Sequence, residues 1–576
     1  MKKTKLRNLI YLGIAVLVLL HILIDSPNLN PLYLDGAMFW ALLFSACLAV
    51  YAVFRYGEVL TYNGRVSVEF TEGSPKKLLA LAAAPWAVIA LVMVYSTPLL
   101  GSAAYRDQLG DPEVRTFSSD IQVMDQSQLP IVDRELAANL ADKKLGERPS
   151  LGSQVYLGEP TKQLVNGELV WVVPLHHSGL FKWFTNMEGT PGYVVVSATN
   201  TNDVEYVEDY KIKIQPNSYL LDDLERHLRL HGALFDGIVD YSFELDESGQ
   251  PYWIVTSYRN TRGFALPEAT GVYLVNASTG EVQHCGMDAI PDWVDRVQPE
   301  SFIVNQINNK GEYVHGIFNF SDKDKYRTSD GEAIIYNNGN CYLFTGLTSI
   351  GQDESAIGFI MVDMVSKRPI LYQMNGATER SAQQSAQGKL QDLGYKADFP
   401  IILNVDGIAT YFMPMKDSAG LIKQYAFVSV ENYSSVGTGE TIEAALRDYS
   451  EVLAQNQGGS IGAGLTGDSE TTGTVSRVAA HVEGGSTVYS LVLAGEHGRI
   501  FTADSSLSAQ LPITQPGDTV RLEYRDGDGY VFEVTAFANT TFTGGEALTE
   551  PGDTAPEEAP AEEVPAEATA PETPAA

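Results

Sequence analysis

The sequence predicts an α+β membrane protein with three N-terminal transmembrane helices, a region of helix-plus-antiparallel-sheet repeats, a small all-β barrel and a disordered acidic tail. Three observations support this prediction. Residues 1–100 contain three long apolar runs, four later segments share one turn-and-strand pattern, and residues 474–537 are dense in strand signals.

The overall composition already excludes several classes of protein. The 576 residues include 39 Lys+Arg against 72 Asp+Glu, a formal net charge of −33, and 44% are hydrophobic. That apolar content can build large cores, so the chain as a whole is not disordered. Three cysteines are too few for a disulfide scaffold or a Cys-rich metal module. A strongly acidic chain lacks the basic surface that nucleic acid needs, so we expect no nucleic-acid partner.

The three apolar runs are Leu9–Ile24, Ala37–Phe54 and Leu78–Leu100. A membrane span needs about 17–20 mostly apolar residues, so each run predicts a transmembrane helix in a lipid bilayer. His21 and Cys47 are the only polar candidates within the runs, and both suit an interface or small apolar position. Three spans with so few polar groups predict an anchor rather than a pore.

Charge predicts the orientation of this anchor. Residues 1–100 carry eight basic and five acidic side chains, and the basic ones lie in the N-terminus and the 55–77 loop. The positive-inside rule therefore places the N-terminus in the cytoplasm and residues 101–576, with net charge −36, on the extracytoplasmic side of the cell membrane. The first run lacks the small-residue cleavage site of a signal peptide, whereas Gly101-Ser-Ala-Ala104 offers one, so cleavage after Ala104 stays open.

Four segments between residues 166 and 432 share one pattern. Each opens with a turn pair, which is Asn166-Gly167, Ser248-Gly249, Asn338-Gly339 or Asp406-Gly407. An apolar strand follows, at 169–175, 252–258, 341–347 or 410–415, and it carries an aromatic residue: Trp171, Trp253, Tyr342 or Tyr411. After a polar loop, a second strand closes each unit, at 193–200, 272–279, 359–366 or 425–432. These are β-hairpin signals.

Amphipathic helices accompany the strands. Apolar residues at helical spacing predict helices at Val132–Lys144, Tyr219–Leu230, Ala377–Leu393 and Thr441–Leu453. A helix followed by antiparallel strands, used four times, gives the α+β architecture.

The helix, the Gly-turn strand and a strand ending in V-[DN]-x-x-[TS]-G-x-[VI] together resemble the PepSY domain, a small extracytoplasmic module of peptidase propeptides and membrane-anchored envelope proteins. The segment Gly249–Val282, ending in VNASTGEV, matches best. Gly339–Leu371, ending in VDMVSKRPIL, lacks the glycine, and the first and last units depart further. The resemblance covers about 130–450 and implies a bacterial binding or inhibitory module without catalytic residues.

The C-terminal part divides into a linker, a barrel and a tail. Gly459–Gly473, rich in Gly, Ser and Thr, reads as a linker. About five short strands in 474–537 resemble a small OB-like barrel, and since nucleic-acid-binding surface is absent, we expect a structural or protein-contact role. From Gly544 the chain carries nine acidic and no basic residues with many Pro and Ala, which predicts disorder. The predicted domains are 1–100, 101–290 (repeats 1 and 2), 291–457 (repeats 3 and 4), 458–473, 474–540 and 541–576.

No sequence motif of a common catalytic mechanism is present, and we expect no catalytic residues, metal or cofactor. His227 and His231 could share a helix face, but solvated histidines explain the spacing better. His176 and His177 are adjacent in a strand and point to opposite faces. The Asp526–Gly529 segment reads as a hairpin turn, and the acids between Asp322 and Glu332 alternate with bases as in a solvated loop.

Two cysteines lie outside the anchor, Cys285 at the end of one repeat and Cys341 at the start of the next strand. An extracytoplasmic disulfide between them would contribute about 4 kcal/mol if unstrained, and two buried thiols are the alternative.

These features together predict a scaffold or binding protein of the bacterial cell envelope. We expect its repeats to hold an envelope protein or peptide partner through exposed strand edges and grooves. The alternative is an envelope hydrolase acting on peptidoglycan or peptide, with a site assembled from distant residues.

Overall fold

The computed structural model describes residues 3–62, 65–70, 75–121, 129–350, 352–457, 469–483, 486–495, 499–508, 510–524 and 531–543. The chain forms two compact units, Met1–Ile461 and Gly462–Ala576. Most of the predicted linker, the Asp526–Gly529 turn and nearly all of the predicted tail lie outside the described residues.

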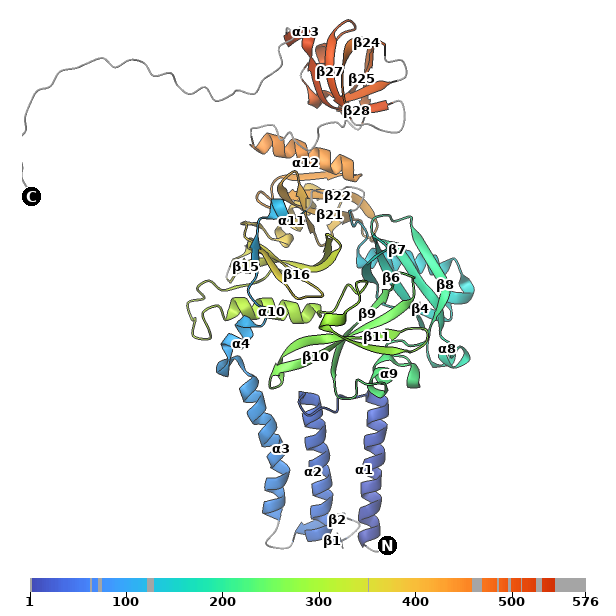
Figure 1. The fold of residues 1–576 in the computed structure, drawn as a ribbon, viewed down its shortest axis with the longest axis vertical. Coiled ribbons are helices and arrows are strands. Elements are labelled where there is room, and N and C mark those ends of the chain that lie inside the picture. The colour runs from blue at the N-terminus through green and yellow to red at the C-terminus, as the bar shows by residue number, and fades with distance from the viewer. Residues whose placement is uncertain are drawn as a thin grey trace, which may run out of the picture. The chain divides into compact units, whose positions relative to one another are not determined.

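Three long helices form the N-terminal part, as the sequence predicts: α1 (Lys3–Asp25), α2 (Leu34–Tyr56) and α3 (Pro75–Ser96) (Figure 1). Each is long and apolar enough to cross a membrane. Their outer surfaces expose large apolar side chains such as Leu17, Leu42 and Leu91, which are 64–71% exposed. Exposed apolar surface on this scale suits lipid rather than water.

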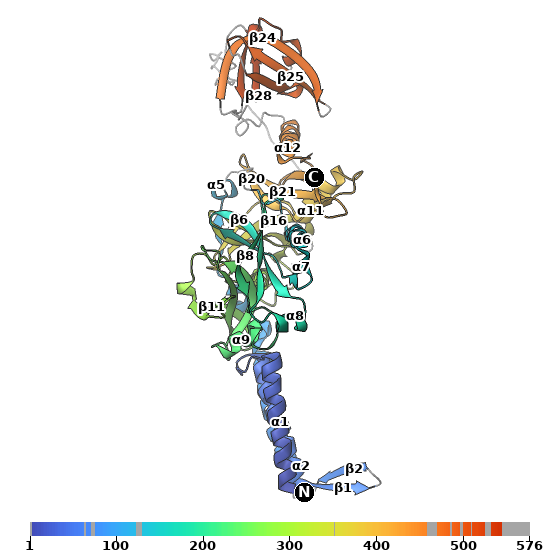
Figure 2. The same cartoon turned by 90° about the vertical axis from the view of Figure 1, so that its right-hand side faces the viewer.

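Two details of this anchor differ from the prediction. The helix α3 ends at Ser96, four residues before the predicted Leu100, and Pro98–Leu100 forms the short 3₁₀ helix η1. Proline disfavours helical backbone at the residue before it and lacks an N–H, which explains the early end. The loop between α2 and α3 contains a hairpin of β1 (Gly57–Tyr62) and β2 (Arg65–Phe70), which the sequence analysis did not predict (Figure 2).

Four sheets follow, one for each predicted repeat. The connection from the anchor contains α4 (Ser102–Asp107), β3 (Glu113–Arg115) and α5 (Phe117–Asp120). The first repeat (130–212) contains α6 (Arg134–Gly146), α7 (Pro149–Gly152), β4 (Val155–Leu157), β5 (Thr161–Val165), β6 (Glu168–His177), α8 (Leu180–Thr185), β7 (Thr190–Ser197) and β8 (Val204–Ile212). The second (213–290) contains η3 (Leu220–Asp222), α9 (Leu224–Leu230), β9 (Gly237–Leu245), β10 (Pro251–Arg262), β11 (Ala265–Asn276), β12 (Val282–Gly286) and η4 (Met287–Ala289).

The other two repeats have the same kinds of element. The third (297–372) contains α10 (Glu300–Glu312), β13 (Tyr326–Thr328), β14 (Ala333–Asn337), β15 (Asn340–Ser349), β16 (Gln352–Asp363) and β17 (Pro369–Tyr372). The fourth (376–457) contains β18 (Gly376–Ala377), α11 (Glu379–Lys389), β19 (Lys396–Ala397), β20 (Ile401–Val405), β21 (Ile408–Lys416), β22 (Ile422–Ser429), β23 (Val436–Gly439) and α12 (Ile442–Gln457). The strands of the four sheets pair antiparallel, except that β3 adds to β17 of the third sheet in parallel, and this sheet also includes β18. The mixed α+β class is therefore confirmed, with α10 and the strands before each turn as elements that the sequence analysis missed.

One backbone contact recurs in every repeat and ties its ends together. The segment before each helix donates a backbone hydrogen bond to the carbonyl at the end of a later strand. The four bonds run from Val132 to Ala198 (3.0 Å), from Ile214 to Ala277 (3.0 Å), from Gln298 to Met364 (2.8 Å) and from Ala377 to Val430 (2.8 Å). All four acceptor residues are completely buried. The repeats therefore share one structural plan, which the degenerate sequence pattern predicted only in part.

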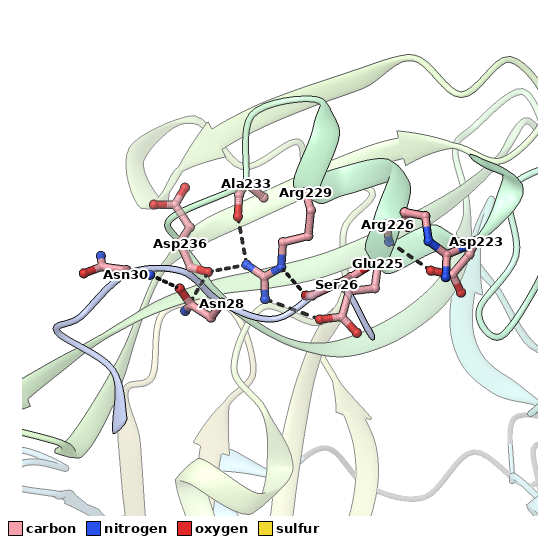
Figure 3. Close-up of polar contacts among 9 residues, drawn as sticks. All are labelled: Ser26, Asn28, Asn30, Asp223, Glu225, Arg226, Arg229, Ala233 and Asp236. Carbon is pink, nitrogen blue, oxygen red and sulfur yellow. Dashed lines mark hydrogen bonds and ion pairs between the residues drawn. The ribbon is translucent and has the colours of Figure 1, made fainter. Parts of the chain in front are cut away.

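The loop between α1 and α2 docks on the second repeat (Figure 3). Arg229 of α9 is 7% exposed and donates to the backbone carbonyls of Ser26 (3.2 Å), Ala233 (2.8 Å) and Asp236 (2.7 Å). Asn28 also donates to the Asp236 carbonyl, at 3.2 Å. Because one buried guanidinium serves carbonyls from the loop and from the repeat, it joins the anchor to the second repeat.

A second junction joins α3 to the tip of the β10–β11 hairpin. The segment 259–270 was predicted as a polar loop, but the two strands continue through it and turn at Gly263 and Phe264. The Phe264 N–H donates to Ser96 Oγ at 2.8 Å, and Arg262 donates to the Leu100 carbonyl at 2.8 Å. The second repeat therefore contacts both the α1–α2 loop and the end of α3.

The C-terminal unit contains a closed five-stranded barrel with strand order β24-β25-β26-β28-β27. Its strands are β24 (Ser469–Glu483), β25 (Ser486–Leu493), β26 (Ile500–Asp504), β27 (Thr519–Tyr524) and β28 (Val531–Asn539). The short helices are η5 (Ser505–Leu507), η6 (Leu511–Ile513) and α13 (Thr540–Thr543). Phe501, Leu511 and Leu522 fill its interior, so the barrel is a packed core rather than a channel.

Candidate functional site

Three edge strands from three repeats line one cavity of about 710 Å³. The strands are β5, β14 and β20, and each is the strand before the turn glycine of its repeat. Among the described residues, each pairs with another strand on one side only. The lining residues include Lys162 and Leu164 of β5, Ile334–Asn337 of β14 and Ile401–Leu403 at β20. The first, third and fourth repeats therefore enclose a space bordered by unpaired strand edges.

The register at the turns determines which backbone groups face outward. In an antiparallel ladder, alternate residues direct their N–H and C=O groups toward the partner strand or away from it. In β5 the outward groups belong to Lys162 and Leu164, since both bond to side chains outside the sheet. The residues at the same distance from the turn are Ile334 and Tyr336 in β14 and Ile402 and Asn404 in β20. Within the described residues, the backbone groups of Ile334 and Ile402 have no outward hydrogen-bond partner.

The edge of β5, in contrast, is closed by side chains. The Leu164 N–H donates to Asp295 Oδ2 at 2.9 Å, and the Tyr336 hydroxyl donates to the Lys162 carbonyl at 3.0 Å. The Tyr336 hydroxyl also lies 2.9 Å from Asp295 Oδ2. Gln163 binds both backbone groups of Leu245 in β9, at 2.6 and 2.9 Å. Side chains that satisfy a strand edge prevent further pairing there, so an added strand can only use β14 or β20.

Behind this edge lies a buried pair of carboxyl groups, Glu244 of β9 and Asp295. The Asp295 N–H donates to Glu244 Oε2 at 3.0 Å, and Ser242 donates to Glu244 Oε1 at 2.7 Å. Burial, with the neighbouring Asp295, raises the pKa of Glu244 to about 8. Burial also raises the pKa of Asp295, although hydrogen bonds from Leu164 and Tyr336 oppose the rise. Burial beside Asp295 therefore favours the protonated form of Glu244 more than in an exposed glutamate.

This preference for the protonated form predicts that Glu244 makes folding stability depend on pH. The folded state keeps the proton up to about pH 8, whereas an unfolded glutamate releases it near 4.5. The contribution of Glu244 is therefore fully present below pH 4.5 and is lost as the pH rises toward 8. Glu244→Gln, which carries no titrating proton, should raise the thermal unfolding midpoint relative to the wild type more at pH 8 than at pH 5.

The control for this experiment is Glu159→Gln, which changes an exposed acid of the same repeat region. It should leave the pH dependence of unfolding as in the wild type. An equal shift of the midpoint at both pH values in Glu244→Gln would contradict the raised pKa of Glu244.

Lys162 lies between this cavity and a second one of about 370 Å³, since it lines both. Its ammonium nitrogen lies 5.1 Å from the centre of the Trp171 ring and, among the described residues, forms no ion pair. Burial, and next the nearby Arg296, lowers the pKa of Lys162 to about 8. Arg296 donates to Glu300 at 3.1 Å, while its buried Nε has no hydrogen-bond partner. The junction thus presents cationic donors that an anionic group would satisfy.

Two of the acids that line the second cavity, Asp133 and Asp398, are neutralised within the protein. Lys416 binds Asp133 at 2.6 Å and Asp398 at 2.9 Å. Burial and the nearby Asp133 raise the pKa of Asp398 to about 6. Because both carboxyl groups bind one ammonium, they serve to join α6 of the first repeat to the fourth repeat.

The predicted strand aromatics occupy one recurring position in three repeats. Trp171 Nε1 donates to the Val132 carbonyl (2.8 Å), Trp253 Nε1 to Ile214 (2.7 Å) and Tyr411 Oη to Ala377 (3.0 Å). Each acceptor lies just before the helix of its own repeat. In the third repeat this position is taken by the buried Leu343, and Tyr342, one residue earlier, is half-buried on the other face of the strand. Trp253 and Tyr411 belong to the repeat cores, whereas Trp171 also lines the second cavity.

The two cysteines are not brought together. Both are buried free thiols, Cys285 in a cluster of the second repeat with Ile254 and Val272, and Cys341 in a cluster of the third repeat with Leu343. Burial raises the pKa of Cys341 to about 12 and also raises that of Cys285. Both thiols are therefore protonated at neutral pH and poor nucleophiles.

His227, His231 and the acidic loop have structural partners, whereas the buried Nε2 atoms of His176 and His177 have no hydrogen-bond partner among the described residues. The rings of His227 and His231 stack with their centres 4.1 Å apart. His227 Nε2 donates to the Gly280 carbonyl and His231 Nδ1 to the His227 carbonyl, both at 2.7 Å. His176 and His177 are both buried. In the loop, Asp322 pairs with Lys325, Asp324 with His315 and Asp330 with Arg380. The described part of the chain contains no group of three or more His, Cys, Asp or Glu that could hold a metal ion.

Sequence reasoning did not identify Lys162, Glu244, Asp295 or Arg296. Asp295 and Arg296 are adjacent, but Lys162 and Glu244 lie far from them in the sequence, so no spacing signals a shared site. The one available signal is Glu244, an acid placed between the apolar Phe243 and Leu245. Such a charge in an apolar strand indicates either an outward face or a buried polar cluster.

Known proteins do not identify the site. Neither the models of known protein families nor the curated proteins give a match to this chain.

Proposed function

We propose that this chain is a membrane-anchored binding protein of the bacterial cell envelope and that it holds an extended peptide segment of a partner in the cavity between its repeats. The observation that carries this proposal is that three edge strands line one cavity and that two of them, β14 and β20, keep outward backbone groups unpaired. An extended peptide can add to such an edge as a further strand.

The location and the family resemblance are parts of the same proposal. Three helices apolar enough to cross a membrane support an anchored protein, and the basic N-terminus supports a cytoplasmic start with residues 101–576 outside. Four repeats, each with a helix and an antiparallel sheet, are compatible with PepSY-like modules. The closed five-stranded barrel is compatible with an OB-like fold in a structural or protein-contact role.

Lys162 and Arg296 indicate the chemistry of the peptide. Lys162 is half-buried and forms no ion pair with a described residue. A carboxylate that binds beside it would offset the free-energy cost of burying the ammonium group. The peptide should therefore carry an acidic side chain or its C-terminal carboxylate toward Lys162. A hydrolase remains the alternative, and we favour binding because the cavity acids Asp133 and Asp398 are both held by Lys416.

Ile334→Pro should weaken peptide binding by about five- to tenfold, because it removes one outward N–H that an added strand would use. Proline at this edge position leaves the ladder to β15 intact, since the Ile334 N–H faces away from it. The measurement is the binding of an array of unstructured acidic peptides to the full chain in nanodiscs, read by fluorescence anisotropy.

Ile334→Val is the matched control, since it keeps the N–H and should bind as the wild type does. Lys162→Met tests the same site without a backbone change and should also weaken binding. The two variants should keep the thermal unfolding midpoint of the wild type. The binding proposal fails if, under that condition, no peptide binds the wild type more tightly than it binds Ile334→Pro and Lys162→Met. Recovery of the peptides in cleaved form would support the hydrolase instead.

A further inference from the structure

Two cavities of opposite character meet where the anchor joins the second repeat. One, of about 730 Å³, is apolar and lies between α2 and α3. The other, of about 520 Å³, is polar and lies between the α1–α2 loop and the second repeat. Leu32 and Gly263 line both cavities, so the two spaces adjoin. Leu32 lies just before α2 and Gly263 lies at the tip of the β10–β11 hairpin, so the junction lies at the start of α2.

The apolar cavity is a groove with one helix on each side. Ala37, Trp40, Ala41 and Phe44 line it from α2 at the spacing of one helix face. Pro85, Val88, Ile89 and Val92 line it from α3 in the same way. The small Ala41 and the Ile89 side chain are buried at 2% and 8% exposure. Within a bilayer no water is present to fill such a groove, so its occupant must be apolar.

The polar cavity offers hydrogen-bond donors just beyond the end of the groove. Its lining includes Asn30 from the α1–α2 loop and Arg259, Asn260 and His284 from the second repeat. Arg259 is exposed and, within the described residues, has no ion-pair partner. The acid of this cavity, Asp236, already accepts a hydrogen bond from the Tyr273 hydroxyl. Arg259 is therefore a cation of this cavity that forms no ion pair with any described residue.

The tip of the β10–β11 hairpin, which covers the end of the groove, is fixed by close contacts with α3. Gly263 adopts a positive φ of 58°, and a Cβ at this position would lie 2.4 Å from Ser96 Oγ. The guanidinium of Arg262 lies 4.4 Å from the centre of the Tyr95 ring of α3. The hairpin tip thus closes the end of the groove and leaves the polar cavity as its continuation.

We propose that these two cavities form one site for a phospholipid of the leaflet next to the repeats, with an acyl chain between α2 and α3 and the phosphate at Arg259. An apolar groove that continues into a polar cavity matches an amphiphile, whereas a second apolar helix would leave the polar part unused. A guanidinium without a partner binds phosphate through a pair of parallel hydrogen bonds. This proposal rests on the membrane location and is independent of the peptide site.

The test uses the full chain in nanodiscs that contain phosphatidylglycerol with a photoactivatable acyl chain. Cross-links mapped by mass spectrometry should concentrate on the groove segments 37–44 and 85–92. Val88→Trp, which fills the groove from a 59% exposed position, should abolish this concentration. Val94→Trp is the matched control, because Val94 is 52% exposed and lies outside the groove, about 120° away around α3.

The headgroup arm of the test uses Arg259→Ala. The concentration of phosphatidylglycerol that gives half-maximal labelling of the groove should be about fivefold higher in Arg259→Ala than in the wild type. Labelling spread evenly over all lipid-facing surfaces, or equal labelling in Val88→Trp and Val94→Trp, would overturn the proposal. Full competition by soluble glycerol phosphate would also overturn it, since it would assign the polar cavity to a free phosphate rather than to a lipid.

Discussion

Arg229→Met should destabilise the junction between the anchor and the second repeat by about 3–5 kcal/mol. The substitution keeps the apolar stem but leaves the carbonyls of Ser26, Ala233 and Asp236 without their common donor. The Ser26 carbonyl loses its donor, at a cost of about 1–3 kcal/mol for a buried polar group without a partner. The carbonyls of Ala233 and Asp236 each lose a bond from a charged donor but keep the Asp236 N–H and Asn28, respectively. The measurement is the thermal unfolding midpoint of the full chain in detergent.

Arg226→Met is the control for this prediction, because it lies on the same helix and also bonds to the anchor. It donates to the carbonyls of Leu23 and Ile24 at the end of α1, in an exposed setting where water can replace it. Its effect should be below about 1 kcal/mol.

A second readout distinguishes undocking from general unfolding. A cysteine introduced at Asn28 should react with a maleimide faster in Arg229→Met than in the wild type below the unfolding midpoint. Equal destabilisation by Arg229→Met and Arg226→Met, with no change in maleimide reaction, would show that Arg229 does not hold the loop.

The elements that the sequence predicted well are those whose signal is local. The three spans are long apolar runs, and the glycine turns require backbone that glycine adopts readily, such as φ 86° at Gly167 and 84° at Gly407. The strands after these turns are rich in β-branched and aromatic residues, so they were predicted too. Their partners before the turns, such as β5 with the sequence TKQLV, are short and show no alternation of polar and apolar residues, so they give a weaker signal.

The cavity could not be predicted, because it depends on packing between repeats. Its edge strands β5, β14 and β20 are far apart in the chain and meet only when the first, third and fourth repeats come together. Glu244 and Asp295 are likewise separated by a whole hairpin, and their interaction follows from burial rather than from spacing. Contacts between segments that are far apart in the chain leave no local pattern in a single sequence.

Trp253→Ala should destabilise the protein by about 3–5 kcal/mol, as large-to-small changes of buried aromatics do. The ring is 4% exposed and packs on Phe243 at 4.9 Å between ring centres. Trp253→Phe should cost less, about 1–3 kcal/mol, because it keeps most of the packing and removes the donor to the Ile214 carbonyl. Both values can be measured by denaturant unfolding of the full chain in detergent.

The same reasoning predicts how the four repeat aromatics differ. Trp171→Phe and Tyr411→Phe should each destabilise by an amount similar to Trp253→Phe, since both remove the donor to a carbonyl before the helix. Tyr342→Phe should have almost no effect, because its hydroxyl has no hydrogen-bond partner within the described residues. If Tyr342→Phe destabilised the protein as much as the other three, the recurring aromatic-to-carbonyl bond could not be what distinguishes them. The energetic contribution of these aromatics therefore follows from their position relative to the helix rather than from their residue type.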